Sequence, residues 1–142
     1  MIQPTVRSIT ESVVLDTTTG PDTLDEIQAT LDRLWEAHEV DDVVRMHMDL
    51  AAGEIGANIV EHSGGSQPIR LRLEVELRPD VVRATFFDEG HPSPVDLGGV
   101  RMPDEMSDRG RGLAIAHRVL DELSYRRGRD GNHWTLVRSL QP

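Results

Sequence analysis

The chain has 142 residues, of which 15 are basic and 25 acidic, so its formal net charge is −10, and it contains no cysteine. This length is sufficient for one domain with its own hydrophobic core. The excess of acidic residues argues against a general nucleic-acid-binding protein, which needs a basic surface. The absence of cysteine excludes disulfides and thiolate metal sites.

No stretch of the sequence is apolar for long enough to span a membrane. The first residues, 1–7, have neither the apolar region nor the cleavage site of a signal peptide. We therefore expect a soluble, cytoplasmic protein that makes no direct contact with nucleic acid or membrane. The acidity does not exclude nucleotide binding, because magnesium and a few local arginines can neutralise a triphosphate.

Residues 1–21 predict one or two strands followed by a loop. Val6, Ile9 and the run 12–15 supply the apolar residues of the strands. The loop is expected at 17–21, where three threonines precede a glycine and a proline.

Two helices are expected next. Apolar residues recur at helical spacing from Asp22 or Thr23, either of which can cap the helix, to about His38. A second helix begins at 41–42, where two aspartates occur together, and ends at a glycine-rich stop near 63–65.

The second predicted helix carries a row of polar residues. Glu54, Asn58 and His62 follow one another at intervals of four residues, which stacks their side chains on one helical face. A carboxylate can accept a proton or order a water, and an amide oxygen is a suitable ligand for magnesium. The pair of Glu54 and Asn58 therefore suits phosphoryl chemistry. The alternative is that both side chains are simply solvated on an outer helical face.

After the glycines, the period of the apolar residues changes from helical to two. Residues 69–77 alternate between apolar and charged, as in a half-buried antiparallel strand, and a turn at 78–80 leads to a returning strand at 81–87. Asp88 ends this strand and Gly90 follows. The carboxylate can accept a hydrogen bond from an exocyclic amine, and the glycine lets the backbone approach a flat ring. An ordinary Asp-x-Gly turn is the alternative.

Residues 93–109 contain prolines, glycines and charges without a sustained period, and they are too many for a simple connector. We expect this segment to be either a functional lid or disordered. It leads into Arg-Gly-Arg-Gly-Leu at 109–113, which opens an apolar helix that runs through Leu120. Free N–H groups at a glycine-rich helix start attract anions, and the two arginines add positive charge. The alternative is a flexible joint before a core helix.

The C-terminal part predicts a closing hairpin, with strands at 122–127 and 132–140 around a turn at 128–131. Thr135 lies in the middle of the last strand. Its hydroxyl could reach a base or the Asp88 carboxylate, although a threonine in a strand is usually only a good strand former. The sequence contains no Walker A motif.

The order of these motifs resembles the histidine-kinase-like (Bergerat-fold) ATPases, and within them the anti-sigma-factor serine/threonine-protein kinases of bacteria. The shared pattern is Glu-x-x-x-Asn on a helix, a hairpin, Asp-x-Gly-x-Pro, a loose lid, and Gly-x-Gly-Leu opening a helix before two strands. The resemblance covers roughly residues 10–140. The glycine-threonine box of larger relatives is not evident, and Thr135 is the one candidate left for it.

The resemblance implies a role for each matching residue. Glu54 would be the general base that takes the proton from a serine hydroxyl, and Asn58 would bind the Mg²⁺ that bridges the phosphates. Asp88 would hold the adenine amine, and Gly90 would let the ring approach. The residues that would close on the triphosphate and begin the next helix are Arg109, Gly110, Arg111, Gly112 and Leu113.

The expected fold is an α/β two-layer sandwich, with a mixed, mostly antiparallel sheet covered by helices on one face, in a single domain over 1–142. The resemblance implies an ATP-dependent kinase that binds a sigma factor and phosphorylates a serine of an anti-sigma-factor antagonist. Two alternatives remain: an ATP-binding module that acts only by protein binding, and an interaction domain with a dead pocket. Relatives often dimerise, and the N-terminal strand region could supply a homodimer interface.

Overall fold

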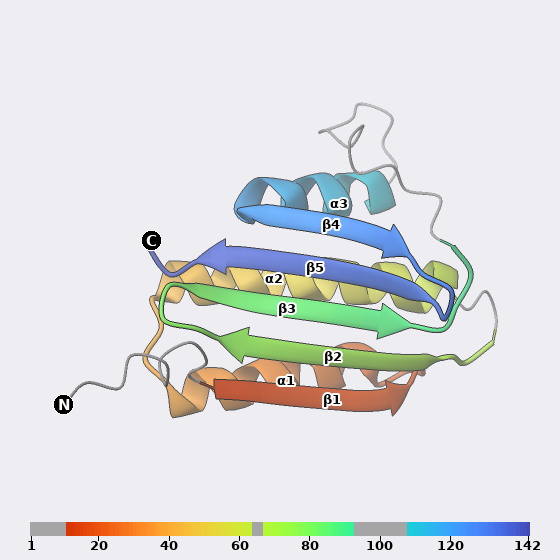
Figure 1. Cartoon of the computed structure of the whole chain (residues 1–142), viewed down its shortest axis with the longest axis horizontal. Coiled ribbons are helices and arrows are strands. Elements are labelled where there is room, and N and C mark those ends of the chain that lie inside the picture. Colours follow the sequence, from red (N-terminus) through yellow and green to blue (C-terminus); the bar gives the residue numbers. More distant parts are fainter. Residues whose placement is uncertain (1–10, 64–66, 93–107) are drawn as a thin grey trace.

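Five strands and three α-helices make up the part of the chain that the computed structural model describes, residues 11–63, 67–92 and 108–142. For 62–63 and 108–111 the description covers the backbone alone. The elements in chain order are β1 (Glu11–Thr18), α1 (Thr23–Ala37), α2 (Asp42–Asn58), the π-helical turn η2 (Ile59–Ser63), β2 (Arg70–Leu77), β3 (Val81–Asp88), α3 (Asp108–Val119), β4 (Glu122–Arg127) and β5 (Asn132–Ser139) (Figure 1).

The strands form one sheet in the order β1-β2-β3-β5-β4, and every neighbouring pair in the described residues is antiparallel. The sequence allowed a mixed sheet, and the connections explain the difference. Two helices separate β1 from β2, so the chain re-enters the sheet at the end where β1 finished (Figure 1). β3 and β4 point in the same direction, but β5 lies between them.

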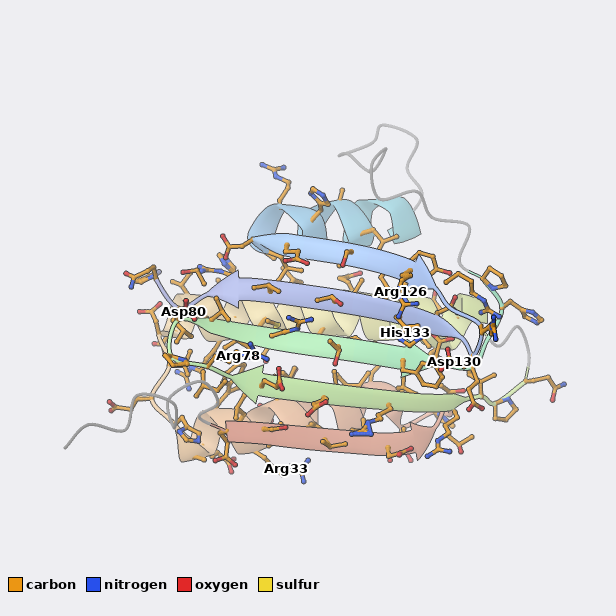
Figure 2. All side chains as sticks on the ribbon, in the orientation of Figure 1. Arg33, Arg78, Asp80, Arg126, Asp130 and His133 are labelled. Carbon is orange, nitrogen blue, oxygen red and sulfur yellow. The ribbon has the colours of Figure 1, made fainter. Side chains whose placement is uncertain are left out.

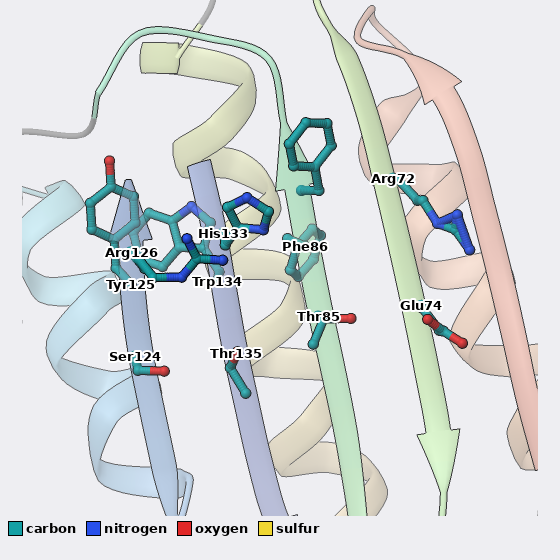
Figure 3. A pocket seen from close by; sticks show the side chains of 11 residues that line it. Arg72, Glu74, Thr85, Phe86, Ser124, Tyr125, Arg126, His133, Trp134 and Thr135 are labelled. Atoms are coloured by element: carbon teal, nitrogen blue, oxygen red, sulfur yellow. The ribbon is translucent and has the colours of Figure 1, made fainter. Parts of the chain in front are cut away.

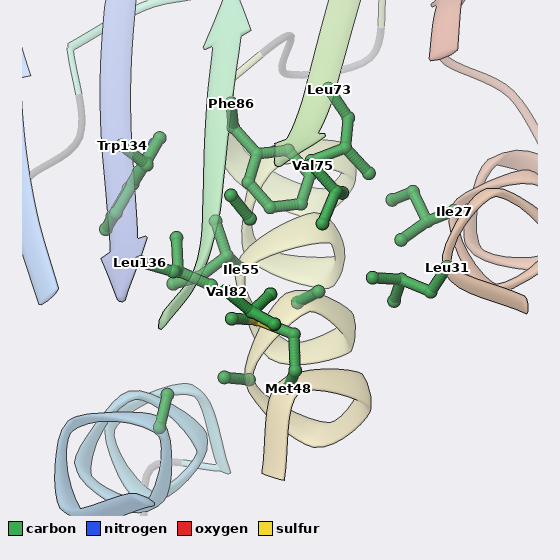
Figure 4. Close-up of a cluster of buried hydrophobic side chains, with 14 of the residues drawn as sticks. Ile27, Leu31, Met48, Ile55, Leu73, Val75, Val82, Phe86, Trp134 and Leu136 are labelled. Carbon is green, nitrogen blue, oxygen red and sulfur yellow. The ribbon is translucent and has the colours of Figure 1, made fainter. Parts of the chain in front are cut away.

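One face of the sheet is covered by the helices, because β2, β3 and β5 bury every second residue. α1, α2 and the sheet meet in a core in which Trp134, Phe86 and Ile27 are at most 1% exposed. Figure 4 shows Ile27, Leu31, Met48 and Ile55 of the helices facing Leu73, Phe86, Trp134 and Leu136 of the strands. The alternating pattern of the sequence thus gives a two-layer α/β fold with helices on one side.

The starts of α1 and α2 follow the predicted signals with one change. Asp41 caps α2, since its carboxylate accepts a hydrogen bond from the Val43 N–H at 2.9 Å. At the start of α1, Asp22 makes no such bond, and the Thr23 hydroxyl instead accepts from the Gly20 N–H at 2.7 Å. α2 ends as a regular helix at Asn58 and continues as η2, a form that often occurs at functional sites.

Some sequence predictions differ from the structure or lie outside it. The predicted loop at 17–21 begins later, because Thr17 and Thr18 still pair with β2. Val6, Ile9 and most of the predicted lid at 93–109 lie outside the described residues. In the part of the chain that the structure covers, no helix has the length and apolarity to cross a membrane.

Leu31→Ala tests the packing of α1 on the sheet. Leu31 is fully buried and Leu24, on the same helix, is 45% exposed. We expect Leu31→Ala to lower the free energy of unfolding by roughly 2–5 kcal/mol, because it removes buried methyl groups and leaves a cavity. Leu24→Ala, the control, should cost less than about 1 kcal/mol. Urea denaturation measures both, and equal losses would contradict the packing of this face.

Candidate functional site

Most of the residues singled out from the sequence lie at one end of the molecule. The C-terminal ends of α2 and β3, the start of α3 and the start of β5 all reach this end (Figure 1). In an antiparallel sheet, the end of one strand lies beside the beginning of its neighbour. The ends of β3 and β4 therefore both lie beside the start of β5. Side chains from distant segments therefore meet on the helix-covered side of the sheet.

Asn58 of α2 places a buried side-chain amide in this group. It is 4% exposed, and its Oδ1 has no hydrogen-bond partner among the described residues. A buried polar atom without a partner costs about 1–3 kcal/mol. Oxygen is the ligand that Mg²⁺ prefers, and this ion usually takes only one or two protein ligands beside water and phosphate oxygens. Asn58 therefore fits a magnesium site that a bound nucleotide would complete.

No group of three or more His, Cys, Asp and Glu residues in the described segments is arranged to hold a metal ion by itself.

Glu54 lies one helical turn before Asn58 on α2, and its side chain is half-buried. Its carboxylate packs against α3, at the position of Gly112. A Cβ atom at residue 112 would overlap the Glu54 carboxyl group, so the glycine is what allows α3 to come this close. The structure thus brings Glu54 next to the first turns of α3.

α3 begins earlier than the sequence indicated. The helix starts at Asp108, so Leu113 lies in its second turn and does not begin it. The Leu113 side chain is 3% exposed and belongs to the hydrophobic core, where it holds α3 on the other elements. Arg109, Gly110 and Arg111 form part of the first turn, which has backbone N–H groups without helical partners.

Asp88 is fully buried at the end of β3, and its Oδ1 accepts two hydrogen bonds. One comes from the Gly90 N–H at 2.9 Å, as expected for an Asp-x-Gly turn. The other comes from the Asn132 Nδ2 at 2.9 Å, on the neighbouring strand β5. The Gly90 carbonyl oxygen in turn accepts from Arg127 Nη1 at 2.6 Å. The Asp-x-Gly turn is therefore bound to the β4–β5 hairpin on both sides.

Gly131 permits this close approach of β5 to β3. Its φ is 157°, and a Cβ atom there would overlap the backbone carbonyl oxygen of Asp88. A glycine avoids both the unfavourable φ and the overlap. The chain turn before β5 is thus adapted to the end of β3.

The prediction that the Thr135 hydroxyl could reach the Asp88 carboxylate is wrong. Thr135 pairs with Thr85 of β3 and lies on the open face, whereas Asp88 is paired with Asn132 and points to the helices. Alternation along the strands places the two side chains on opposite faces. The side chain that lies next to the Asp88 carboxylate is that of Asn132. The sequence does place Asn132 directly after the turn glycine. Its pairing with Asp88, however, depends on the register of β5 against β3, which the sequence pattern does not determine.

The open face has a hollow of its own, of about 600 Å³, lined by Thr135 and by residues such as Arg72, Glu74, Ser124 and Arg126 (Figure 3). At its edge, His133 packs against Phe87 with ring centroids 5.0 Å apart. His133 Nε2 also lies 3.2 Å from the Asp130 carboxylate, and this hydrogen bond lowers the pKa of Asp130 (Figure 2). Neither Asp88 nor Asn132 lines this hollow, because both side chains point to the helix-covered side of the sheet.

Comparison with known proteins gives a consistent result. A family model described as the histidine kinase-like ATPase domain matches residues 17–138. The structure of the RsbU and RsbW domains of Rv1364c from Mycobacterium tuberculosis superposes with a TM-score of 0.65 at 20% identity. That match covers 92% of this chain and 33% of the other, so the chain spans about a third of that protein's structure. No curated protein matches the sequence.

Two histidine kinase structures are also similar. The histidine kinase domain of the blue-light-activated kinase EL346 from Erythrobacter litoralis has a TM-score of 0.51 and 17% identity, over 83% of this chain and 61% of that one. The catalytic domain of histidine kinase ThkA has a TM-score of 0.56 and 13% identity, over 91% of this chain and 98% of that one. At these identities the superpositions show a common fold.

Gly131→Ala tests the close approach of β5 to Asp88. We expect it to lower the free energy of unfolding by roughly 1–3 kcal/mol, because the added Cβ meets backbone atoms and the φ is unfavourable. The control is Gly53→Ala in α2, where a Cβ meets open space. That change should stabilise the helix by about 0.5–1 kcal/mol. Urea denaturation of both variants decides the matter, and a Gly131→Ala protein as stable as the unaltered chain would refute the contact.

Proposed function

Because the chain belongs to the histidine kinase-like ATPase domain family, we propose that it is an ATP-dependent serine/threonine-protein kinase that acts as an anti-sigma factor. In this proposal it binds a sigma factor and phosphorylates a serine of an anti-sigma-factor antagonist. The observation that carries the kinase proposal is the buried Asn58 Oδ1, without a partner in the described segments, one helical turn from the Glu54 carboxylate. In this proposal, Asn58 supplies an oxygen ligand for the metal and Glu54 supplies the base, one helical turn apart on α2.

The nucleotide would bind between α2, the end of β3 and the start of α3. Asp88 would accept the adenine amine, and Gly90 would leave room for the ring. The first turn of α3, with Arg109, Gly110 and Arg111, would hold the phosphates through its backbone N–H groups and charge. Bound Mg²⁺ supplies charge neutralisation of the phosphates, and Asn58 is the residue that would hold it.

Glu54 would act as the general base. Its half-buried carboxylate is held next to α3 by the space that Gly112 leaves. From there it would take the proton of the serine hydroxyl while that oxygen attacks the terminal phosphate of ATP, whose bond to the bridging oxygen breaks so that ADP leaves. The rest of the catalysis would be positioning, which the packing of α3 against α2 supports.

The assignment of partners rests on the order of the motifs, which resembles that of anti-sigma-factor kinases, and on the likeness to a structure that contains an RsbW domain. Nucleotide state would then bias which partner is held, because ATP and ADP stabilise different partner-bound states to different extents. The alternative is a module that binds nucleotide and partner but transfers no phosphate. The packing of Glu54 next to α3 favours the kinase, since a module that only binds has no need of a base there.

Asn58→Ala tests the magnesium site. We expect the unaltered protein to bind ATP more tightly with Mg²⁺ than without, and the variant to lose roughly ten- to a hundredfold of the affinity with Mg²⁺, about 1.4–2.8 kcal/mol. Its affinity without Mg²⁺ should stay nearly the same. Isothermal titration calorimetry measures all four conditions.

The stability of the nucleotide-free Asn58→Ala protein is the control. Because Asn58 Oδ1 makes no hydrogen bond in the described part, its removal should not lower the melting temperature. A lower melting temperature with unchanged Mg²⁺ dependence would mean that Asn58 has a structural role only. If the unaltered protein binds no ATP under any condition, the kinase proposal fails.

Glu54→Gln tests the base. The variant keeps the shape of the side chain against Gly112, so ATP affinity should change little. Phosphate transfer should fall by roughly 10²–10⁴-fold, because an amide cannot take the proton. Mass spectrometry of phosphoserine on a candidate antagonist protein provides the rate. Equal rates in the two proteins would show that Glu54 is not the base, and ATP binding without any transfer by the unaltered protein would favour the non-catalytic module.

A further inference from the structure

Asn132 is a fully buried polar residue at the start of β5, directly opposite Asp88 in the strand register. A primary amide has two N–H donors and an oxygen that can accept two hydrogen bonds. In Asn132 all four are used. Nδ2 donates to Asp88 Oδ1 at 2.9 Å and to the His91 carbonyl oxygen at 2.7 Å. Oδ1 accepts from the Tyr125 hydroxyl at 2.5 Å and from Arg127 Nη1 at 3.2 Å.

The chemistry of these partners fixes which way the amide points. Arg127 can only donate, so it requires the amide oxygen on its side. An ionised Asp88 can only accept, so it requires the amide N–H groups on the other. A reversed amide would place two donors together at Arg127 and two acceptors together at Asp88. The network therefore runs in one direction, from Arg127 through Asn132 to Asp88.

The same network holds the backbone around Gly90. Arg127 Nη1 donates to the Gly90 carbonyl oxygen at 2.6 Å, and Asn132 holds the next carbonyl, that of His91. The Gly90 N–H is bound to Asp88 Oδ1 at 2.9 Å. The Asp88 carboxylate and the turn that follows it are thus fixed relative to each other by two side chains, Asn132 of β5 and Arg127 of β4. This is more than the stability of the hairpin requires, because β4 and β5 are already paired through their backbones.

We propose that Asn132 is a positioning residue for base recognition: it holds the Asp88 carboxylate and the Gly90 turn in the arrangement that accepts the exocyclic amine of adenine, and so sets the selectivity for that base. This inference rests on the nucleotide-binding function proposed above. A carboxylate held in a fixed position can only accept hydrogen bonds, so a ligand with an N–H donor at that position binds more tightly. A purine without the amine gains nothing from that arrangement.

The first experiment compares two ligands that differ only in the amine, ADP and purine riboside 5′-diphosphate, both with Mg²⁺. We expect the unaltered protein to bind ADP about tenfold more tightly or better. Asn132→Ala should bind purine riboside diphosphate almost as tightly as the unaltered protein does. It should bind ADP only about as tightly as purine riboside diphosphate, so that the ratio of the two affinities falls to a value between about 1 and 3. Thr135→Ala is the matched control, because it alters the same strand on the opposite face, and it should keep the ratio.

The second experiment uses Asn132→Asp, which keeps the shape of the side chain and its acceptors for Tyr125 and Arg127. At pH 8 it places a second carboxylate against Asp88, and ADP binding should be weak. As the pH falls, the two carboxylates share a proton, and a protonated Asp restores the donor that Asn132 supplies. ADP affinity, taken as a ratio to that of the unaltered protein at each pH, should therefore recover between pH 8 and 5.5. If Asn132 had only a structural role, the affinity for purine riboside 5′-diphosphate would recover to the same extent as the affinity for ADP.

Each outcome of these titrations decides the inference. A collapsed ratio in Asn132→Ala and the acid recovery of Asn132→Asp support it. An unchanged ratio in Asn132→Ala, or equal losses for the two ligands, would overturn it and leave nucleotide binding intact. If the unaltered protein binds ADP and purine riboside diphosphate equally well, the inference is likewise overturned, and nucleotide binding is left intact. If the unaltered protein binds neither ligand, the proposed function itself fails, and this inference with it.

Discussion

The site depends above all on the antiparallel register of β3 against β5. That register pairs Asp88 with Asn132 and, two residues earlier along β3, Phe86 with Trp134. Because side chains alternate along a strand, all four point to the helix-covered face, and the two aromatic side chains are at most 1% exposed. A shift of β3 by one residue would move the Phe86 ring into water and Asp88 to the open face. The same burial that stabilises the sheet thus also holds the polar pair in place.

The secondary structure could be predicted from the period of the apolar residues, since two helices, two hairpins and the helix after the glycines follow directly from it. Contacts between segments could not be predicted in this way. Thr135 was chosen for its residue type, but its face is set by the register of β5 against β3. The same information was needed to find Asn132, whose neighbour Asp88 is 44 residues away.

The spacing of Glu54 and Asn58 predicted a common helical face, but their surroundings come from tertiary packing. The sequence alone could not tell a solvated Asn58 from a buried one, because that depends on the layers that close over α2. The reason for the glycine at 112 was also hidden. A glycine near a helix start suggested free N–H groups for an anion, whereas the structure adds that residue 112 makes room for Glu54 from another helix.

The pairing of Asp88 with Asn132 also has a kinetic consequence. The β2–β3 and β4–β5 hairpins each join neighbouring segments of the chain and can close over short loops. The junction of β3 with β5 joins the two hairpins across the whole segment that contains α3, and such distant contacts form late because closing the longer loop costs more entropy. A chain with both hairpins formed but not yet docked would lack the base-recognition network. During refolding, the appearance of this network would therefore mark the docking of the two halves of the sheet.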